Sequence, residues 1–267
     1  MTVLRLEKSN PDYSRKNTTT FTIHSSYLQS RHDVSVYHQP SDNKDIPIVV
    51  LLHGVYGSHW VWMDLGGVHL VYEQLRAQGL SEFILVMPSD GGLWDGSGYL
   101  PLNEHGNYDG WIVDDVINTV KANIDQASEN SPVYISGLSM GGYGALRLGA
   151  KYPDIFSGIS AHSSVTSLVD LQQFIENPVD DYQCQDEQEA NLSYWLTKNS
   201  HTLPPIRFDC GTDDTLYQSN LSLVNTMTEL AIPHEFEALA GAHEWPYWHK
   251  NVAKTLQFFH QLEKKKC

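Results

Sequence analysis

The sequence contains little cysteine and no long apolar run. Its three cysteines are Cys184, Cys210 and Cys267. Their spacing matches neither a disulfide framework nor a C-x-x-C motif. Cys210 lies within an apolar run, where we expect a small buried hydrophobe. No stretch reaches the roughly 18 uninterrupted apolar residues that a membrane-spanning helix needs, so the sequence argues against such a helix.

Basic residues are also scarce relative to acidic ones. Lys and Arg total 17 against 32 Asp and Glu, which gives a formal net charge of −15. This charge disfavours nucleic acid and anionic membranes as partners, and a homo-oligomer stays open. Residues 1–8 lack the apolar core and cleavage site of a signal peptide. We therefore expect a cytoplasmic protein, with secretion as the alternative if a leader has been removed.

Apolar runs and helical periodicity alternate along the chain from residue 46 onward. Strands are predicted at residues 46–52, 83–87, 133–135, 156–161, 205–210 and 235–239. Helices are predicted at residues 67–79, 111–124, 216–230 and 246–262, and a further helix after residue 139. Residues 20–28 and 32–37 predict an antiparallel pair, and residues 1–18 a surface arm. These patterns predict one α/β domain over residues 1–267, with a mostly parallel sheet, an antiparallel start and helices on both faces.

Two long segments interrupt this alternation. Residues 89–107 form a glycine-rich loop, and residues 163–203 form a polar excursion with helical patches at 167–176 and 186–197. Loops of this length are often functional. We expect the excursion to lie near the active site.

The pattern G-x-S-x-G occurs at residues 137–141, between a predicted strand and a predicted helix. In this context the central residue, Ser139, is a candidate nucleophile at a sharp turn. The following helix directs its first N–H groups towards Ser139, where negative charge would develop. The alternative is a glycine-rich turn with a serine N-cap, or a phosphate-binding loop.

An acyl-transfer serine also needs a base and an orienting acid. His243 follows the strand at 235–239 in a turn of small residues and is the candidate base. Two aspartates, Asp213 and Asp214, follow the strand at 205–210. We favour Asp214 as the acid and expect Asp213 to face solvent and cap the next helix, although either could serve as the cap.

The backbone N–H groups of Val55 and Met140 are the candidate oxyanion donors, because they follow the first buried strand and the nucleophile, respectively. The alternative for residues 53–55 is an ordinary turn between a strand and a helix. Trp94, Tyr56 and Trp245 lie next to these motifs and are the candidate substrate-binding residues, with Trp94 expected to be exposed in its glycine-rich loop. No cluster of His, Cys, Asp or Glu has metal-ligand spacing, so neither a metal nor another cofactor is expected.

Four motifs together resemble the esterase branch of the α/β-hydrolases, which includes S-formylglutathione hydrolases (esterase D), tributyrin esterases, feruloyl and acetyl xylan esterase domains, and mycolyltransferases of the antigen 85 type. The motifs are residues 51–58, 137–145, 210–214 and 241–248, and the resemblance spans about residues 20–262. It implies the α/β-hydrolase fold, with Ser139 as nucleophile, Asp214 as acid and His243 as base. It implies no metal or organic cofactor.

The sequence departs from S-formylglutathione hydrolases at residues 53–57, which read His-Gly-Val-Tyr-Gly. The family pattern of those enzymes is a cysteine-containing Ser-Gly-Leu-Thr-Cys loop at this place. The excursion at 163–203 also carries seven acidic residues against one lysine, which would repel an anionic thioester. We therefore expect a serine carboxylesterase for short acyl esters, of acylated sugars or aryl groups. The alternatives are S-formylglutathione hydrolysis, acyl transfer to an acceptor, and a catalytically silent binding module.

Overall fold

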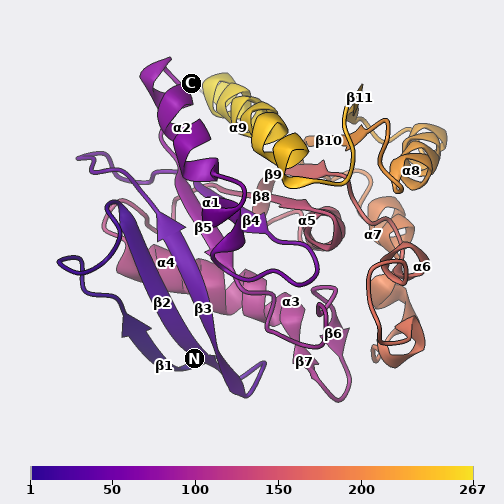
Figure 1. Ribbon diagram of the computed structural model, residues 1–267, viewed down its shortest axis with the longest axis horizontal. Coiled ribbons are helices and arrows are strands. Elements are labelled where there is room, and N and C mark those ends of the chain that lie inside the picture. The colour runs from indigo at the N-terminus through magenta and orange to yellow at the C-terminus, as the bar shows by residue number, and fades with distance from the viewer. Residues whose placement is uncertain (1, 267) are drawn as a thin grey trace.

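A computed structural model describes residues 2–266 (Figure 1). Nine strands form one sheet in the order β1-β2-β3-β5-β4-β8-β9-β10-β11. The strands are β1 (Val3–Lys8), β2 (Thr18–Ser25), β3 (Ser30–Tyr37), β4 (Ile48–Leu52), β5 (Ile84–Pro88), β8 (Val133–Leu138), β9 (Phe156–His162), β10 (Ile206–Gly211) and β11 (Glu235–Leu239). β2 and β3 form the predicted antiparallel pair, and the pairs from β5 to β11 are parallel, also as predicted. β1 pairs antiparallel with β2, and β3 pairs antiparallel with β5.

Helices cover both faces of this sheet. The larger ones are α2 (Val68–Ala77), α4 (Ile117–Asn123), α5 (Met140–Lys151), α7 (Leu192–Lys198), α8 (Tyr217–Glu229) and α9 (Trp245–Lys266). Short helices are α1 (Val61–Asp64), α3 (Tyr108–Gly110), α6 (Leu168–Leu171), η2 (Val179–Asp181) and η3 (Glu187–Ala190), and a π-helical turn, η1 (Trp111–Val116), precedes α4. A small hairpin, β6 (Pro101–Leu102) and β7 (Gly106–Asn107), lies in the predicted loop at 89–107. No described helix is both long enough and apolar enough to cross a bilayer.

β4 shows why the strands read as continuous apolar runs. All five of its residues are buried. Val50 and its alternate neighbours pack in one cluster with residues of α4, α5 and α8, whereas Val49 and Leu51 pack in a second cluster with residues of α1, α2 and α9. Because both faces are covered, period-2 alternation of polar and apolar residues is absent.

The prediction of a surface arm over residues 1–18 is wrong for its first part. Residues 3–8 form β1, which pairs with β2 at the edge of the sheet. The strand is mostly exposed, and Leu4 is 56% exposed. An edge strand is held by backbone hydrogen bonds on one side only, so its side chains need not be apolar and the sequence gives little signal.

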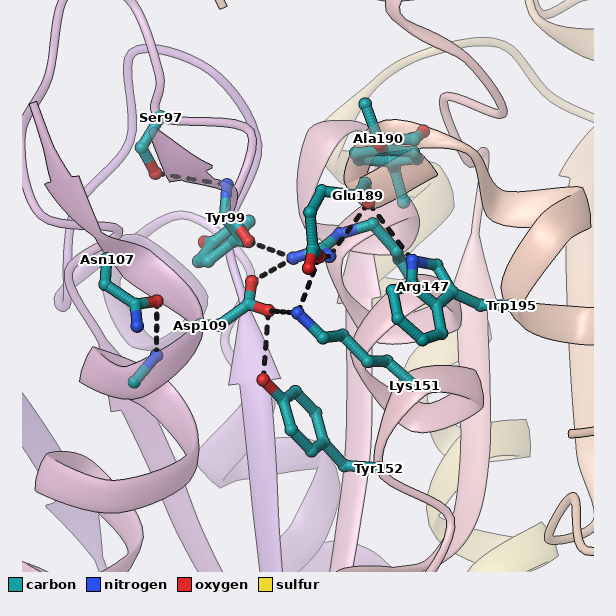
Figure 2. Close-up of polar contacts among 12 residues, drawn as sticks. Ser97, Tyr99, Asn107, Asp109, Arg147, Lys151, Tyr152, Glu189, Ala190 and Trp195 are labelled. Atoms are coloured by element: carbon teal, nitrogen blue, oxygen red, sulfur yellow. Dashed lines mark hydrogen bonds and ion pairs between the residues drawn. The ribbon is translucent and has the colours of Figure 1, made fainter. Parts of the chain in front are cut away.

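Figure 2 shows a buried ionic network that joins α5 to the excursion. Arg147 on α5 is fully buried and pairs with Asp109, which is also buried. The Lys151 ammonium lies 2.6 Å from Asp109 and 2.5 Å from Glu189 of η3. Arg147 also donates hydrogen bonds to the backbone oxygens of Tyr99 (2.5 Å) and Glu189 (3.1 Å). Three segments far apart in the chain are thereby held together.

Replacement of Arg147 by Met should lower the free energy of unfolding by about 3–5 kcal/mol, because the buried Asp109 would lose its guanidinium partner and keep only Lys151 and Tyr152. Urea denaturation of the purified protein measures this. Arg5→Met is the matched control, since Arg5 and its partner Glu7 are both more than 60% exposed. An unchanged midpoint for the Arg147 variant would contradict the role of the network.

Candidate active site

Ser139 occupies the sharp turn between β8 and α5. Its φ of 54° and ψ of −122° lie in a region that residues other than glycine rarely adopt. The turn brings strand and helix so close that a Cβ on Gly137 would lie 2.1 Å from the backbone oxygen of Gly141. Ser139 itself is only 2% exposed, because neighbouring segments close around it.

Three predicted side chains form one hydrogen-bonded series. Ser139 Oγ lies 3.0 Å from His243 Nε2, and His243 Nδ1 lies 2.9 Å from Asp214 Oδ2. Each residue follows the carboxyl end of a parallel strand: β8, β11 and β10, respectively. Since these ends share one edge of the sheet, residues 104 positions apart in sequence meet there.

The environments of the two aspartates differ. The Asp214 side chain is fully buried, and its Oδ1 accepts a hydrogen bond from the N–H of Leu216 at 2.8 Å. Burial alone would raise the pKa of Asp214, but the hydrogen bond and charge interaction with His243 and the Leu216 N–H lower it below its usual value. The group is therefore ionised at neutral pH.

Asp213 is exposed, as predicted, but the prediction that it caps the next helix is wrong. α8 begins only at Tyr217, and its N-cap residue, Leu216, makes no capping bond through its side chain. The residue that accepts an N–H bond in this turn is Asp214. The intervening turn separates Asp213 from the helix, so its carboxylate lies too early in the chain to act as the cap.

The N–H groups of Val55 and Met140 border the nucleophile. Met140 is the first residue of α5, so its N–H has no partner within the helix. The loop that carries Val55 presses on Ser139, since a Cβ on the adjacent Gly54 would lie 3.1 Å from Ser139 Cβ. No hydrogen bond from either N–H to another group is found among the described residues. Their assignment as oxyanion donors stays a prediction.

Residues 174–176 of the excursion, here called the strap, lie against this site. The ring of Phe174 stacks on His243, with ring centroids 5.0 Å apart and an interplanar angle of 20°. The Tyr56 hydroxyl donates a hydrogen bond to the backbone oxygen of Phe174, and the N–H of Glu176 donates one to Asp95 at 2.8 Å. Phe174 is not among the residues that the sequence motifs indicate. Its only signal is an aromatic residue within a polar segment.

The three aromatic residues predicted to bind substrate differ in how they relate to the hydrogen-bonded series of Ser139, His243 and Asp214. Tyr56 belongs to the strap contact and is 70% exposed. Trp245 contacts Trp248, whose ring meets that of His243 edge-on at 5.0 Å. Trp94 is 37% exposed, as predicted, but it lines a separate hollow of about 550 Å³ with residues 103–105, 180, 181 and 183.

The described residues include no group of three or more His, Cys, Asp or Glu side chains arranged to hold a metal ion. Two of the cysteines, Cys184 and Cys210, are free, and Cys210 is buried as predicted. Burial raises the pKa of the Cys184 thiol to about 11, which keeps it protonated. Cys267 lies outside the described residues.

Comparison with known proteins gives consistent matches. The chain matches the family described as "Putative esterase" over residues 25–259. An acetyl esterase from Caldicellulosiruptor saccharolyticus is 27% identical over 265 residues, which cover 93% of this chain and 94% of that protein. A solved ferulic acid esterase is 25% identical, with a TM-score of 0.78 and coverage of 92% of this chain and 98% of its own.

An S-formylglutathione hydrolase from Staphylococcus aureus has a TM-score of 0.78 at 19% identity, covering 96% of this chain and 99% of its own, which is a likeness of fold. The predicted α/β-hydrolase fold is thereby confirmed. The family match spans most of the chain and agrees with the predicted motifs. The chain belongs to the "Putative esterase" family and is a carboxylic ester hydrolase.

Proposed function

We propose that this enzyme is a serine esterase that hydrolyses short-chain acyl esters through a covalent acyl-enzyme. The observation that carries the proposal is the series from Ser139 through His243 to Asp214, with distances of 3.0 and 2.9 Å. Such a series provides a nucleophile, its base and the acid that orients the base. The proposed partner is a small-molecule ester, and the mechanism needs no cofactor.

The reaction follows from the positions of these groups. His243 Nε2 takes the proton of the Ser139 hydroxyl as its oxygen attacks the ester carbon. The N–H groups of Val55 and Met140 donate hydrogen bonds to the oxyanion that forms, each worth about 3–4 kcal/mol. His243 returns the proton to the leaving alcohol, which leaves an acyl group on Ser139. A water molecule then attacks the acyl carbon as His243 takes its proton, and His243 returns a proton to Ser139 Oγ as the carboxylic acid leaves. The Asp214 carboxylate stabilises the imidazolium in both steps.

The strap supports a short acyl group. Tyr56 and Phe174 bridge the space beside His243, and Ser139 is only 2% exposed. A long acyl chain would have to displace this bridge. The acetyl esterase relative is consistent with a small acyl group, and the ferulic acid esterase structure is consistent with an aryl or sugar ester.

The negative charge beside the strap disfavours S-formylglutathione, the substrate named for the structural neighbour from Staphylococcus aureus. Desolvation raises the pKa of Tyr56, and the negative charges of Asp95 and Glu176 raise it further. These carboxylates would repel the carboxylates of a glutathione thioester. Hydrolysis of S-formylglutathione in preference to p-nitrophenyl acetate would therefore favour the alternative substrate.

Replacement of Ser139 by Ala should abolish hydrolysis of p-nitrophenyl acetate and stoichiometric labelling by a fluorophosphonate. Ser136→Ala is the control: this serine lies on β8, the strand that leads to Ser139, is fully buried, and its hydroxyl has no hydrogen-bond partner among the described residues. The control should keep both properties. Labelling of the Ser139 variant would identify a different nucleophile, and an unlabelled wild type would favour a silent binding module.

The adjacent aspartates provide a second matched pair. Asp214→Asn should lower kcat by about 10³–10⁴, because a neutral amide neither holds the required imidazole tautomer nor stabilises the imidazolium. Asp213→Asn should lower kcat by less than about tenfold, since Asp213 is exposed. Assays of the purified variants with p-nitrophenyl acetate decide this. An active Asp214 variant beside an inactive Asp213 variant reverses the assignment.

Removal of the Phe174 ring should relax the preference for short acyl groups. For Phe174→Ala, the ratio of kcat/KM for p-nitrophenyl octanoate to that for the acetate should rise about tenfold, which is the low end of the effect of one methylene in an apolar pocket. Val169→Ala, a 77% exposed position in the same excursion, is the control and should leave the ratio unchanged. An unchanged ratio in the Phe174 variant means that the strap does not limit the acyl chain.

A further inference from the structure

A second buried polar cluster lies directly behind the proposed active site. At its centre is Asp209 of β10, which is fully buried. Its Oδ2 lies 2.9 Å from Nδ1 of the buried His162 and 2.6 Å from Nη1 of Arg207. Its Oδ1 accepts a hydrogen bond from the Tyr247 hydroxyl at 2.7 Å. None of these side chains takes part in the proposed reaction.

One arm of this cluster supports the nucleophile. The N–H of Ser139 donates a hydrogen bond to the backbone oxygen of His162 at 3.0 Å. The N–H of the next residue, Ser163, donates to the backbone oxygen of Asp209 at 2.8 Å. The imidazole of His162 lies between Asp209 and the Thr255 hydroxyl, which is 2.7 Å from Nε2. The side-chain contacts of His162 therefore fix the backbone group that holds Ser139.

The other arm supports the base. Tyr247 lies in the first turn of α9, and its N–H donates a hydrogen bond to the backbone oxygen of Glu244, the residue after His243, at 3.1 Å. Its ring also packs on the turn before His243, because a Cβ on Gly241 would lie 2.6 Å from Tyr247 Cδ2. The position of the Tyr247 ring therefore limits where the loop that carries His243 can lie.

The turn that follows β10, the strand of Asp209, carries Asp214, the acid of the proposed reaction. Asp209 precedes Asp214 by five residues on β10 and its following turn. The N–H of Asp213 donates a hydrogen bond to the backbone oxygen of Gly241 at 3.0 Å, so the acid turn and the base turn are directly joined. Asp209 is thus continuous in the chain with the turn of Asp214, and it is linked to the turn of Ser139 through His162 and to the turn of His243 through Tyr247.

We propose that Asp209 and Tyr247 are positioning residues, which hold the turns of Ser139, His243 and Asp214 in register for catalysis. The inference rests on the proposed function. Its physical basis is the steep dependence of rate on alignment: a displacement of about 1 Å can lower a rate by 10². A buried carboxylate is a demanding anchor, because it must keep each of its partners in place.

The charge states of the two groups suit this role. Burial would raise the pKa of Asp209, but His162 and Arg207 lower it below its usual value. Burial and the Asp209 carboxylate raise the pKa of Tyr247 well above its usual value. The phenol therefore remains a donor and the carboxylate an acceptor across the range in which activity is measured.

The Tyr247→Phe variant tests the proposal, because it removes the hydroxyl and keeps the ring that packs on Gly241. Its kcat for p-nitrophenyl acetate should fall about tenfold with KM unchanged within about twofold, since only alignment in the transition state is affected. The rate of fluorophosphonate labelling should fall in the same proportion. Both are measured well below the midpoint of thermal unfolding.

Tyr72→Phe is the matched control. Tyr72, on α2, is 1% exposed, and its hydroxyl accepts a hydrogen bond from the N–H of Phe83 at 2.7 Å. Phe83 directly precedes β5, so this bond involves none of the three turns of the series. This variant should lose stability and retain the wild-type kcat. A double mutant with Asp209→Asn adds a second measure: the fall in kcat should be smaller than the product of the two single effects. If Asp209→Asn does not fold, Tyr247→Phe alone decides.

Three results would overturn the inference: a Tyr247→Phe kcat within about twofold of wild type, an equal fall in kcat for Tyr72→Phe, or a change in KM alone. Failure of the proposed function looks different. In that case the wild type itself would neither hydrolyse p-nitrophenyl acetate nor react with the fluorophosphonate.

Discussion

The close approach of β8 and α5 at Ser139 is the constraint on which the rest of the structure depends. A backbone in a rarely populated conformation persists only if its surroundings hold it there. Here the surroundings are the glycines on either side, which leave no room for a Cβ, and the backbone bond from Ser139 to His162. β4 contributes too, since a Cβ on Gly141 would lie 2.3 Å from the backbone oxygen of Leu52. The strained turn is thus fixed by its neighbours in the sheet.

Those neighbours also bring the polar groups of the site together. Parallel strands end at one edge of the sheet, so the turns after β8, β10 and β11 converge there. The apolar clusters on the two faces hold the strands in register, and the polar cluster around Asp209 lies just beneath the converging turns. Alignment of Ser139, His243 and Asp214 is therefore a property of the sheet edge as a whole.

The sequence predicts those parts of the molecule whose signals are local. The turn at Ser139, the strands buried on both faces and the turns bearing Asp214 and His243 each have a short pattern of their own, and the structure has them where predicted. β1 was missed because an edge strand needs no apolar pattern. Phe174 and Asp209 were missed because their roles come from contacts with residues far away in sequence.

The ionic network of Arg147, Asp109, Lys151 and Glu189 is one of two polar anchors that attach the excursion to the rest of the fold. The later part of the excursion is tied to α5, the helix behind the nucleophile, and its beginning is tied to α8 by a hydrogen bond from Ser219 to Asp170 at 2.7 Å. The stretch between these anchors carries Phe174 and reaches the site by a ring contact and a few hydrogen bonds. Leu171, Ile175 and Tyr182 of this stretch are buried in the main apolar cluster, but the positions between them are exposed or half-buried. New substrate preferences can therefore evolve at those positions while the machinery beneath stays intact.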